Sequence, residues 1–183
     1  FAKADSLGRP CVINISAGVY AGSHDGQDLD AQRIDSLLKA KSGRSIVCAA
    51  GNSGNYAAFH LGYDVVPDTS FTWFSFNPSA NYFGSYSPNG SVFIEIFADT
   101  ASFNNVDFSI GADLTSPNYE KRAETQFLNI QGFFDGTYTL DGNGIYNDAL
   151  TNSNGDDIAN VYIGFDLIND NKTYLLQVII DPD

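Results

Sequence analysis

The sequence of 183 residues changes composition near residue 60, and this break limits what the chain can fold into. Residues 1–60 contain six basic and five acidic side chains, a net charge of +1, and four aromatic residues. Residues 61–183 contain three basic and 17 acidic side chains, a net charge of −14, and 21 aromatic residues. Such a contrast favours two separately packed domains. We expect a first domain over residues 1–64 and a second over residues 65–183.

The charge of the whole chain excludes one class of partner. Its formal value is −13, and because phosphate backbones are bound by clustered Lys and Arg, we expect no nucleic acid. No apolar stretch reaches the roughly 18–20 residues of a membrane span, and we find no signal-peptide pattern. The chain begins at Phe1 and contains no Met, so we interpret it as an internal piece of a longer protein.

The first domain has the pattern of a βαβ unit. The β-branched run PCVINISAG (residues 10–18) and the run SIVCAAG (residues 45–51) predict two buried strands. Between them, residues 28–42 carry apolar side chains three and four positions apart, which predicts one apolar helix face, and Gly43 ends that helix. Strands joined in this way run parallel, so we expect a partial parallel sheet of the α/β class.

Small residues follow both predicted strands, where open parallel sheets bind their ligands. Neither segment has the GxGxxG or the Walker spacing, so a nucleotide site is unsupported. Instead, the second strand leads to the amide side chain of Asn52, which stands between Gly51 and Gly54. Glycines beside it would allow a ligand to approach the backbone closely.

Three segments in this order resemble the subtilisin-like serine peptidases, the subtilases: VINISAG (12–18), GSHDG (22–26) and IVCAAGNSG (46–54). The resemblance covers about a third of the chain and implies hydrolysis of a peptide bond in a protein substrate. It implies that the Asn52 NH2 group completes the oxyanion hole, where an uncharged fixed donor stabilises the tetrahedral intermediate. It also implies that the backbone of two tripeptides lines the walls of the primary substrate pocket: Ser16, Ala17 and Gly18, and Ala49, Ala50 and Gly51.

The chain departs from the subtilase pattern at the catalytic triad. The Asp-Thr-Gly, His-Gly-Thr-His and Gly-Thr-Ser-Met-Ala elements are absent, and neither His24 nor His60 fits the motif of the catalytic histidine. Removal of the triad removes nearly all acyl-transfer catalysis. We therefore expect this chain to be inactive alone, as part of a parent hydrolase.

The second domain has the pattern of an all-β antiparallel sandwich. Aromatic and β-branched runs alternate with turn signals such as SPNG, DGNG and NDNK. Some subtilases carry a β-sandwich or jelly-roll-like insert at this position, and DFSIGAD (107–113) resembles part of one. The expected strands are 70–76, 91–98, 106–112, 125–130, 136–140, 161–168 and 174–181, with a short helical turn near 99–103.

Two questions of ligation stay open. Oxygen-bearing side chains cluster at residues 141–148 and 152–157, where turn chemistry is the first interpretation and Ca²⁺ binding the second. They lack the EF-hand spacing, and we expect no other metal or cofactor. Cys11 and Cys48 occupy equivalent depths of the two predicted strands, and we favour free thiols over a disulfide.

We therefore predict a fragment of a secreted or cell-envelope (periplasmic) subtilisin-like endopeptidase. Two other interpretations stay open: a non-catalytic β-sandwich module that binds glycan or protein, and an inactive subtilase homologue that serves as a scaffold. A βαβ piece alone would leave strand edges unpaired and apolar faces uncovered. We therefore also expect it to self-associate or to pack on the β-sandwich.

Overall fold

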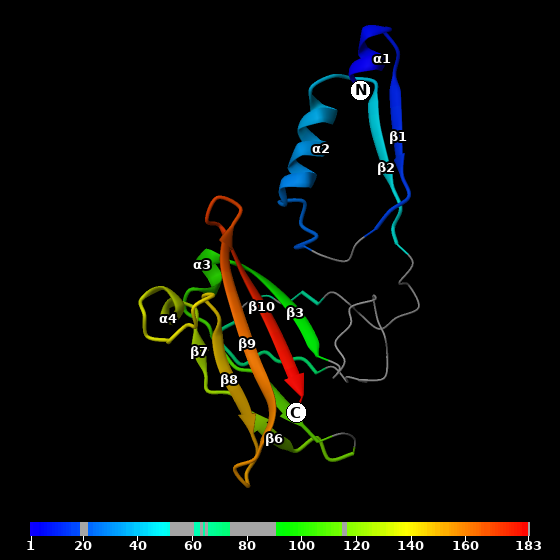
Figure 1. Cartoon of the computed structure of the whole chain (residues 1–183). Coiled ribbons are helices and arrows are strands. Elements are labelled where there is room, and N and C mark those ends of the chain that lie inside the picture. The colour runs from blue at the N-terminus through cyan, green and yellow to red at the C-terminus, as the bar shows by residue number, and fades with distance from the viewer. Residues whose placement is uncertain are drawn as a thin grey trace. The chain divides into compact units, whose positions relative to one another are not determined.

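The structure is a computed structural model that describes residues 1–18, 22–51, 61–62, 64, 66–73, 91–114 and 117–182. The chain forms two compact units, Phe1–Tyr63 and Asp64–Asp183, which are called the first and the second unit below (Figure 1). Strands dominate the regular structure, and most of their pairings are antiparallel. The antiparallel β structure predicted for the second unit is confirmed, and the parallel part predicted for the first unit is limited to two strands.

The first unit is a small parallel sheet with its connecting helix. Its elements are α1 (Ala2–Ser6), β1 (Cys11–Ile15), α2 (Leu29–Lys39) and β2 (Arg44–Cys48). Strands β1 and β2 pair in parallel, with Cys11 opposite Arg44 and Ile15 opposite Cys48. This pairing and the helix between the strands are as the sequence predicts, whereas α1 was not expected.

Helix α2 forms where the apolar spacing predicts it. Asp28 caps it by accepting a hydrogen bond of 2.9 Å from the Ala31 amide, which satisfies one of the free N–H groups of the first turn. Beyond its last turn, Gly43 has a φ of +83°, a conformation that favours glycine and turns the chain into β2. The half-buried residues of α2 are the four apolar ones of the predicted face: Ala31, Ile34, Leu37 and Leu38.

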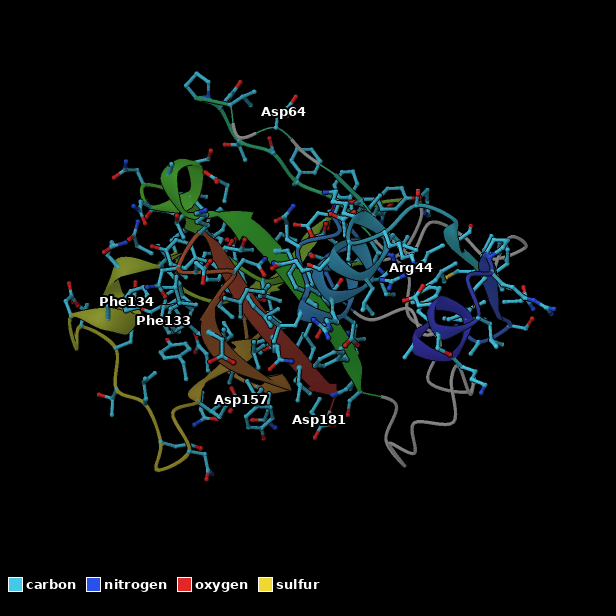
Figure 2. The ribbon with its side chains drawn as sticks, turned by 90° about the horizontal axis from the view of Figure 1, so that it is seen from above. Arg44, Asp64, Phe133, Phe134, Asp157 and Asp181 are labelled. Carbon is cyan, nitrogen blue, oxygen red and sulfur yellow. The ribbon has the colours of Figure 1, made fainter. Side chains whose placement is uncertain are left out.

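Arg44, at the start of β2, joins the elements of the first unit (Figure 2). Its guanidinium donates 2.7 Å to the Leu37 carbonyl at the end of α2 and also forms an ion pair with Asp5 of α1. The same group lies over the Phe1 ring, 5.1 Å from its centroid. Lys41 lies 3.3 Å from the other oxygen of the Asp5 carboxylate. These contacts hold both helices against one end of the sheet.

The first unit buries little of its apolar surface. None of its described residues is buried; partly covered and exposed side chains alternate along β1, and along β2 as far as Val47. Val12 is 67% exposed and Val47 is 52% exposed. Successive side chains point to opposite faces of a sheet, so the face that carries these two valines is the uncovered one.

The second unit is built on a four-stranded antiparallel sheet with the order β3-β10-β9-β8. Strands β8, β9 and β10 are consecutive antiparallel neighbours, and β3, which precedes them in the chain, pairs with β10. This is the strand order of a Greek key with the chain direction reversed. Their bounds are β3 Val92–Asp99, β8 Tyr146–Thr151, β9 Asp157–Ile168 and β10 Thr173–Pro182.

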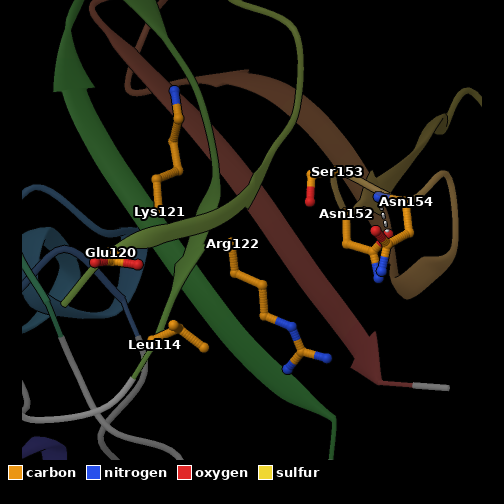
Figure 3. A pocket seen from close by; sticks show the side chains of 7 residues that line it. All are labelled: Leu114, Glu120, Lys121, Arg122, Asn152, Ser153 and Asn154. Atoms are coloured by element: carbon orange, nitrogen blue, oxygen red, sulfur yellow. Dashed lines mark hydrogen bonds between the residues drawn. The ribbon is translucent and has the colours of Figure 1, made fainter. Parts of the chain in front are cut away.

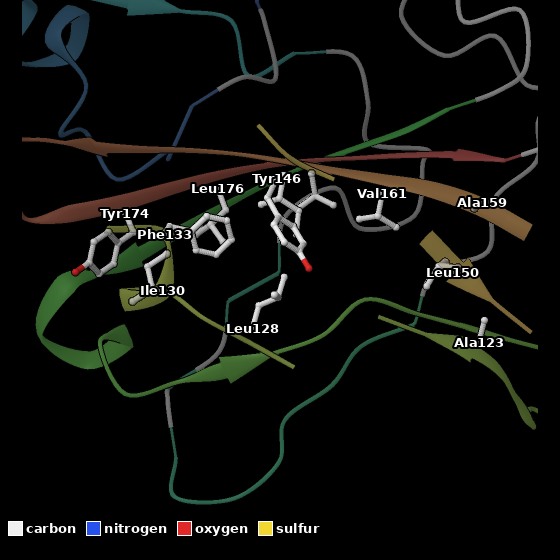
Figure 4. Close-up of a cluster of buried hydrophobic side chains, with 12 residues drawn as sticks. Ala123, Leu128, Ile130, Phe133, Tyr146, Leu150, Ala159, Val161, Tyr174 and Leu176 are labelled. Atoms are coloured by element: carbon white, nitrogen blue, oxygen red, sulfur yellow. The ribbon is translucent and has the colours of Figure 1, made fainter. Parts of the chain in front are cut away.

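Short elements form a second layer over this sheet. They are α3 (Thr100–Phe103), β4 (Asp107–Phe108), β5 (Gly111–Asp113), β6 (Lys121–Glu124), β7 (Leu128–Asn129) and α4 (Gln131–Phe134). Strand β4 pairs with β7 and β5 pairs with β6, both antiparallel. The core lies between the layers, where Leu128 and Ile130 meet the inner side chains of the sheet, such as Val161, Leu176 and Val178 (Figure 4).

The strand predictions for the second unit have mixed outcomes. Those that became β3, β9 and β10 are confirmed, and so is the short helical turn, which is α3. The run 106–112 divides into β4 and β5, and 125–130 shortens to β7. Residues 70–73 form no strand, while 74–76 lie outside the described residues.

The strand predicted at 136–140 is wrong, and two strands were missed. Asp135 accepts hydrogen bonds from the Thr137 amide and hydroxyl, and Gly136 has a φ of +80°, so this segment is a turn. Only Leu140 forms an isolated bridge, to Tyr146. Strands β6 and β8 were missed because their sequences, KRAE and YNDALT, are rich in polar residues.

Gly132 of α4 provides a test of the second unit's core. A Cβ atom built there would lie 2.7 Å from Cζ and 2.8 Å from Cδ2 of Tyr138, with Cε2 closer still. That ring has little freedom to move, because its hydroxyl accepts 2.8 Å from the Asn129 amide and it packs on Phe133. We expect Gly132→Ala to cost about 1–3 kcal/mol of unfolding free energy, measured by urea denaturation with circular dichroism.

The matched control is Gly142→Ala, since a Cβ atom at Gly142 meets nothing within 4 Å. Its unfolding free energy should stay within about 0.5 kcal/mol of the unchanged chain. Equal stability of the two variants would contradict the packing described for α4.

The Arg44–Asp5 pair predicts a pH dependence of the first unit. The hydrogen bond from Arg44 holds the pKa of Asp5 below its ordinary value of 3.8, and Lys41 lowers it further. A carboxylate with a lowered folded-state pKa contributes stability above its ordinary pKa and loses it as the pH falls through the folded value. We expect Asp5→Asn to weaken the amide hydrogen-exchange protection of β2 at pH 7, and this effect should fade as the pH falls through the lowered pKa of Asp5.

Asp35→Asn is the control for this experiment, because the Asp35–Lys39 pair is exposed on the surface of α2. Exposed pairs contribute about 0–1 kcal/mol. A loss of protection in the Asp5 variant that is as large at low pH as at neutral pH would refute the assigned ion pair.

Candidate functional site

The two tripeptides singled out in the sequence come together at one end of the parallel sheet. Strands β1 and β2 end at Ile15 and Cys48, which are partners in the register. The Ala49 amide donates 3.0 Å to the Ile15 carbonyl, so the ladder continues one residue past the strands. Residues 16–18 and 49–51 therefore follow the strands at the same end of the sheet, and all six are exposed.

The two segments lie next to each other, and the space between them would admit a Cβ atom. A Cβ atom built on Gly18 would lie 4.0 Å from the Gly51 Cα atom. Gly51 has a φ of +87°, a backbone conformation that L side chains rarely adopt. The Asn14 side-chain amide donates 3.0 Å to the Ser16 hydroxyl, which orients the first segment. The arrangement presents two backbone walls whose side chains are small.

Two residues considered in the sequence analysis cannot be placed in the structure. Asn52, the predicted oxyanion donor, and His60 lie outside the described residues. The segment with His24 is described as a turn, in which His24 has a φ of 54°. There Asp25 accepts from the Ser23 hydroxyl and, at 2.8 Å, from the Gln27 amide. These bonds, led by that from Ser23, lower the pKa of Asp25.

The two cysteines occupy opposite ends of the sheet, not equivalent depths. Cys11 faces Arg44 at the start of β2, whereas Cys48 faces Ile15 at the end of β1. Four residues along a strand correspond to about 13 Å, while disulfide-linked Cα atoms lie about 4.4–6.8 Å apart. Both thiols are free, and Cys48, the last residue of β2, is exposed.

The acidic loops of the second unit show turn chemistry. Asp141 accepts from the amides of Asn143 and Ile145 at 2.8 and 2.9 Å, and these bonds lower the pKa of its carboxyl. Asn152 accepts in the same way from Asn154 and Asp156. Within the described part of the chain, no three His, Cys, Asp or Glu side chains group in a way that would hold a metal ion.

A second surface was not singled out from the sequence. The hairpin of β5 and β6 borders an open cavity of about 350 Å³ (Figure 3). Exposed aromatic rings contact the same hairpin: Trp73 donates 2.6 Å from Nε1 to Asp113, and its ring stacks near Tyr119. The signal available in the sequence was Trp73, the sole tryptophan of the chain. Because it stands in the run 70–76, it was assigned to a strand.

Comparison of the chain with models of protein families, with curated proteins and with solved structures finds no match. Among the described residues, no helix is both long enough and apolar enough to cross a membrane.

The positions of the cysteines predict two thiols of unequal reactivity. The exposed Cys48 should react rapidly with a thiol reagent, and the partly buried Cys11 more slowly, because access of the reagent limits the rate. Cys48→Ser should remove the fast phase and Cys11→Ser the slow one, in rapid-mixing experiments with Ellman's reagent. Fewer than two reactive thiols in the unreduced, unfolded chain would indicate a disulfide and would contradict the parallel register.

Proposed function

We propose that the chain belongs to a subtilisin-like serine peptidase and supplies the oxyanion side of its active site. In this proposal Asn52 donates to the developing oxyanion, and residues 16–18 and 49–51 form the two walls that bind the substrate strand. The Asp, His and Ser of the catalytic triad would come from other parts of the protein. The substrate is a peptide or protein, and the reaction is hydrolysis of a peptide bond.

One observation carries the proposal: the two tripeptides are exposed, backbone-lined and side by side at the carboxyl ends of parallel strands. Ligands of open parallel sheets bind at this edge. A peptide substrate pairs its backbone with such walls only if no large side chain intervenes, and Ser, Ala and Gly meet this requirement. Small walls also leave room for a large substrate side chain between them.

The residue types suit acyl transfer. When a nucleophile attacks a peptide carbonyl, negative charge develops on the oxygen, and a fixed amide donor stabilises that charge without a counter-ion. Asn52 directly follows the second wall in the sequence. A substrate held between the walls would therefore have its carbonyl close to this amide. In its ground state the substrate gains little from such a donor, which acts mainly in the transition state.

The exposed sheet face and unpaired strand edges of the first unit also support the proposal. Parallel sheets are normally covered on both faces, yet the face with Val12 and Val47 is open, and no described strand pairs with the outer edges of β1 and β2. In a larger α/β domain, such as that of a subtilase, further strands would pair with these edges and helices would cover the open face. The second unit is then a β-sandwich insert, jelly-roll-like in our proposal, and the parent protein acts outside the cell or in its envelope.

The proposal predicts the effect of Asn52→Ala in the complete gene product. Loss of the equivalent asparagine in subtilisin itself lowers kcat about 10²–10³-fold, and we expect a fall of that order here. KM should change by less than about threefold, because the interaction is made mainly in the transition state. The measurement is steady-state hydrolysis of a chromogenic peptide.

The matched control is Asn55→Ala, the same change three residues further along the same segment. We expect its kcat to stay within about twofold of the unchanged enzyme. An unchanged kcat in the Asn52 variant would remove the oxyanion role. If the complete gene product lacks a downstream Gly-Thr-Ser motif and does not cleave peptides, the peptidase proposal itself fails.

A further inference from the structure

Three aromatic side chains are exposed together on the second unit. Phe71 is 65%, Trp73 63% and Tyr119 56% exposed. The Phe71 and Trp73 ring centroids lie 4.8 Å apart, and Trp73 and Tyr119 lie 6.1 Å apart with ring planes inclined by 30°. Soluble proteins seldom leave large contiguous apolar groups in water unless these bind something. Trp73 and Tyr119 present roughly parallel faces, and Phe71 is tilted by 58° against Trp73.

Two of the three rings are tied to the β5–β6 hairpin, since Tyr119 lies in its loop and Trp73 bonds to β5. The Trp73 indole donates 2.6 Å to the Asp113 carboxylate at the end of β5, which sets the plane of the ring. The Leu114 amide donates 2.8 Å to the Glu120 carbonyl and closes the hairpin beside Tyr119. Tyr119 itself has a φ of +47°, a conformation that few residues with a large side chain adopt. Because its hydrogen bond to Asp113 already orients it, the Trp73 ring loses little entropy when a ligand stacks on it.

Polar side chains border the same hairpin. The cavity of about 350 Å³ is lined by Leu114 and six polar residues: Glu120, Lys121, Arg122, Asn152, Ser153 and Asn154 (Figure 3). Lys121 pairs with Glu124 at 2.8 Å. The Arg122 guanidinium has no hydrogen bond or ion pair with the described residues. Carboxylates, amides, a hydroxyl and a guanidinium together offer both donors and acceptors.

We propose that this surface binds a neutral oligosaccharide. This surface, called the hairpin surface below, consists of the three rings, Asp113 and the residues that line the cavity. A sugar ring has faces of C–H groups that stack on aromatic rings and a rim of hydroxyls that both donate and accept hydrogen bonds. Aromatic faces beside a few polar groups are the usual composition of a small-ligand site.

The charge of the second unit selects among ligands. Residues 61–183 carry a net charge of −14, which repels acidic glycans and nucleic acids at a distance. Proline-rich peptides also dock on aromatic surfaces, but six polar lining residues out of seven match a ligand rich in hydroxyls better. The surface lies within the second unit, so this inference does not rest on the proposed peptidase function. Failure of glycan binding would leave the role of Asn52 untouched.

The sole tryptophan makes the experiment specific, because the intrinsic tryptophan emission of the chain comes from Trp73 alone. The 183-residue chain is titrated with glucan, xylan and mannan oligosaccharides of four to six sugars, and calorimetry gives a second measurement of Kd. We expect at least one of them to shift the emission saturably, with a Kd of about 10 μM to 1 mM.

Variants assign the binding to the hairpin surface. Tyr119→Ala and Arg122→Ala keep the Trp73 signal and should each weaken binding about tenfold or more. Trp73→Ala, followed by calorimetry, should abolish it. Phe93→Ala removes an aromatic ring of similar exposure, 57%, from strand β3. It should change Kd by less than about twofold, and circular dichroism checks that every variant is folded.

Three results would overturn the proposal. The first is that no neutral oligosaccharide binds with a Kd below about 10 mM. The second is that Tyr119→Ala and Arg122→Ala bind as well as Phe93→Ala. The third is that a uronic-acid oligosaccharide or a proline-rich peptide shifts the Trp73 emission while no neutral sugar does.

Discussion

The parallel pairing of β1 with β2 is the constraint on which the candidate site depends. Because the strands run in the same direction and Ile15 faces Cys48, the segments that follow them lie at the same end of the sheet. Antiparallel pairing of the same sequences would send those segments to opposite ends. The connection needed for a parallel pair is α2, whose apolar face covers one side of the sheet. Arg44 secures the other end by binding both helices.

The second unit has its own core and needs no such crossover. Across its main sheet, Ile94, Val178, Ile163 and Tyr146 face one another in register, and the last three are buried. Aromatic and β-branched residues at alternate positions form this face, while acidic and amide side chains occupy the turns. The change in composition near residue 60 therefore reflects two ways of building a core. The negative charge of the second unit is shared between these turns and the strands, which contain nine of its 17 acidic residues.

The sequence predicted the elements whose periodicity is strong. Helix α2 has apolar residues at helical spacing, and β9 and β10 are rich in aromatic and β-branched residues, so these elements could be placed without tertiary information. The prediction failed for residues 136–140, because the Asp135 side chain competes for the backbone and turns the chain. It also failed for β6, a charged strand stabilised by pairing with β5.

The two candidate sites also differ in how far they could be predicted from the sequence. Residues 16–18 and 49–51 were singled out by the resemblance to subtilases, and their proximity follows from the parallel pairing of the strands before them. The hairpin surface was not found, because Trp73 and Tyr119 are 46 positions apart in the sequence and meet only through the fold. The prediction that Cys11 and Cys48 lie at equivalent depths was wrong, because it depended on the register of the two strands. A pattern of apolar residues does not fix that register to the residue.

The most direct test of the account is the structure of the complete gene product with a peptide-aldehyde inhibitor that forms a tetrahedral adduct. The account predicts that the adduct oxygen lies about 2.7–3.1 Å from the Asn52 Nδ2 atom, with the inhibitor backbone between residues 16–18 and 49–51. An adduct whose oxygen is bound by other donors, or an inhibitor bound away from these two segments, would contradict it.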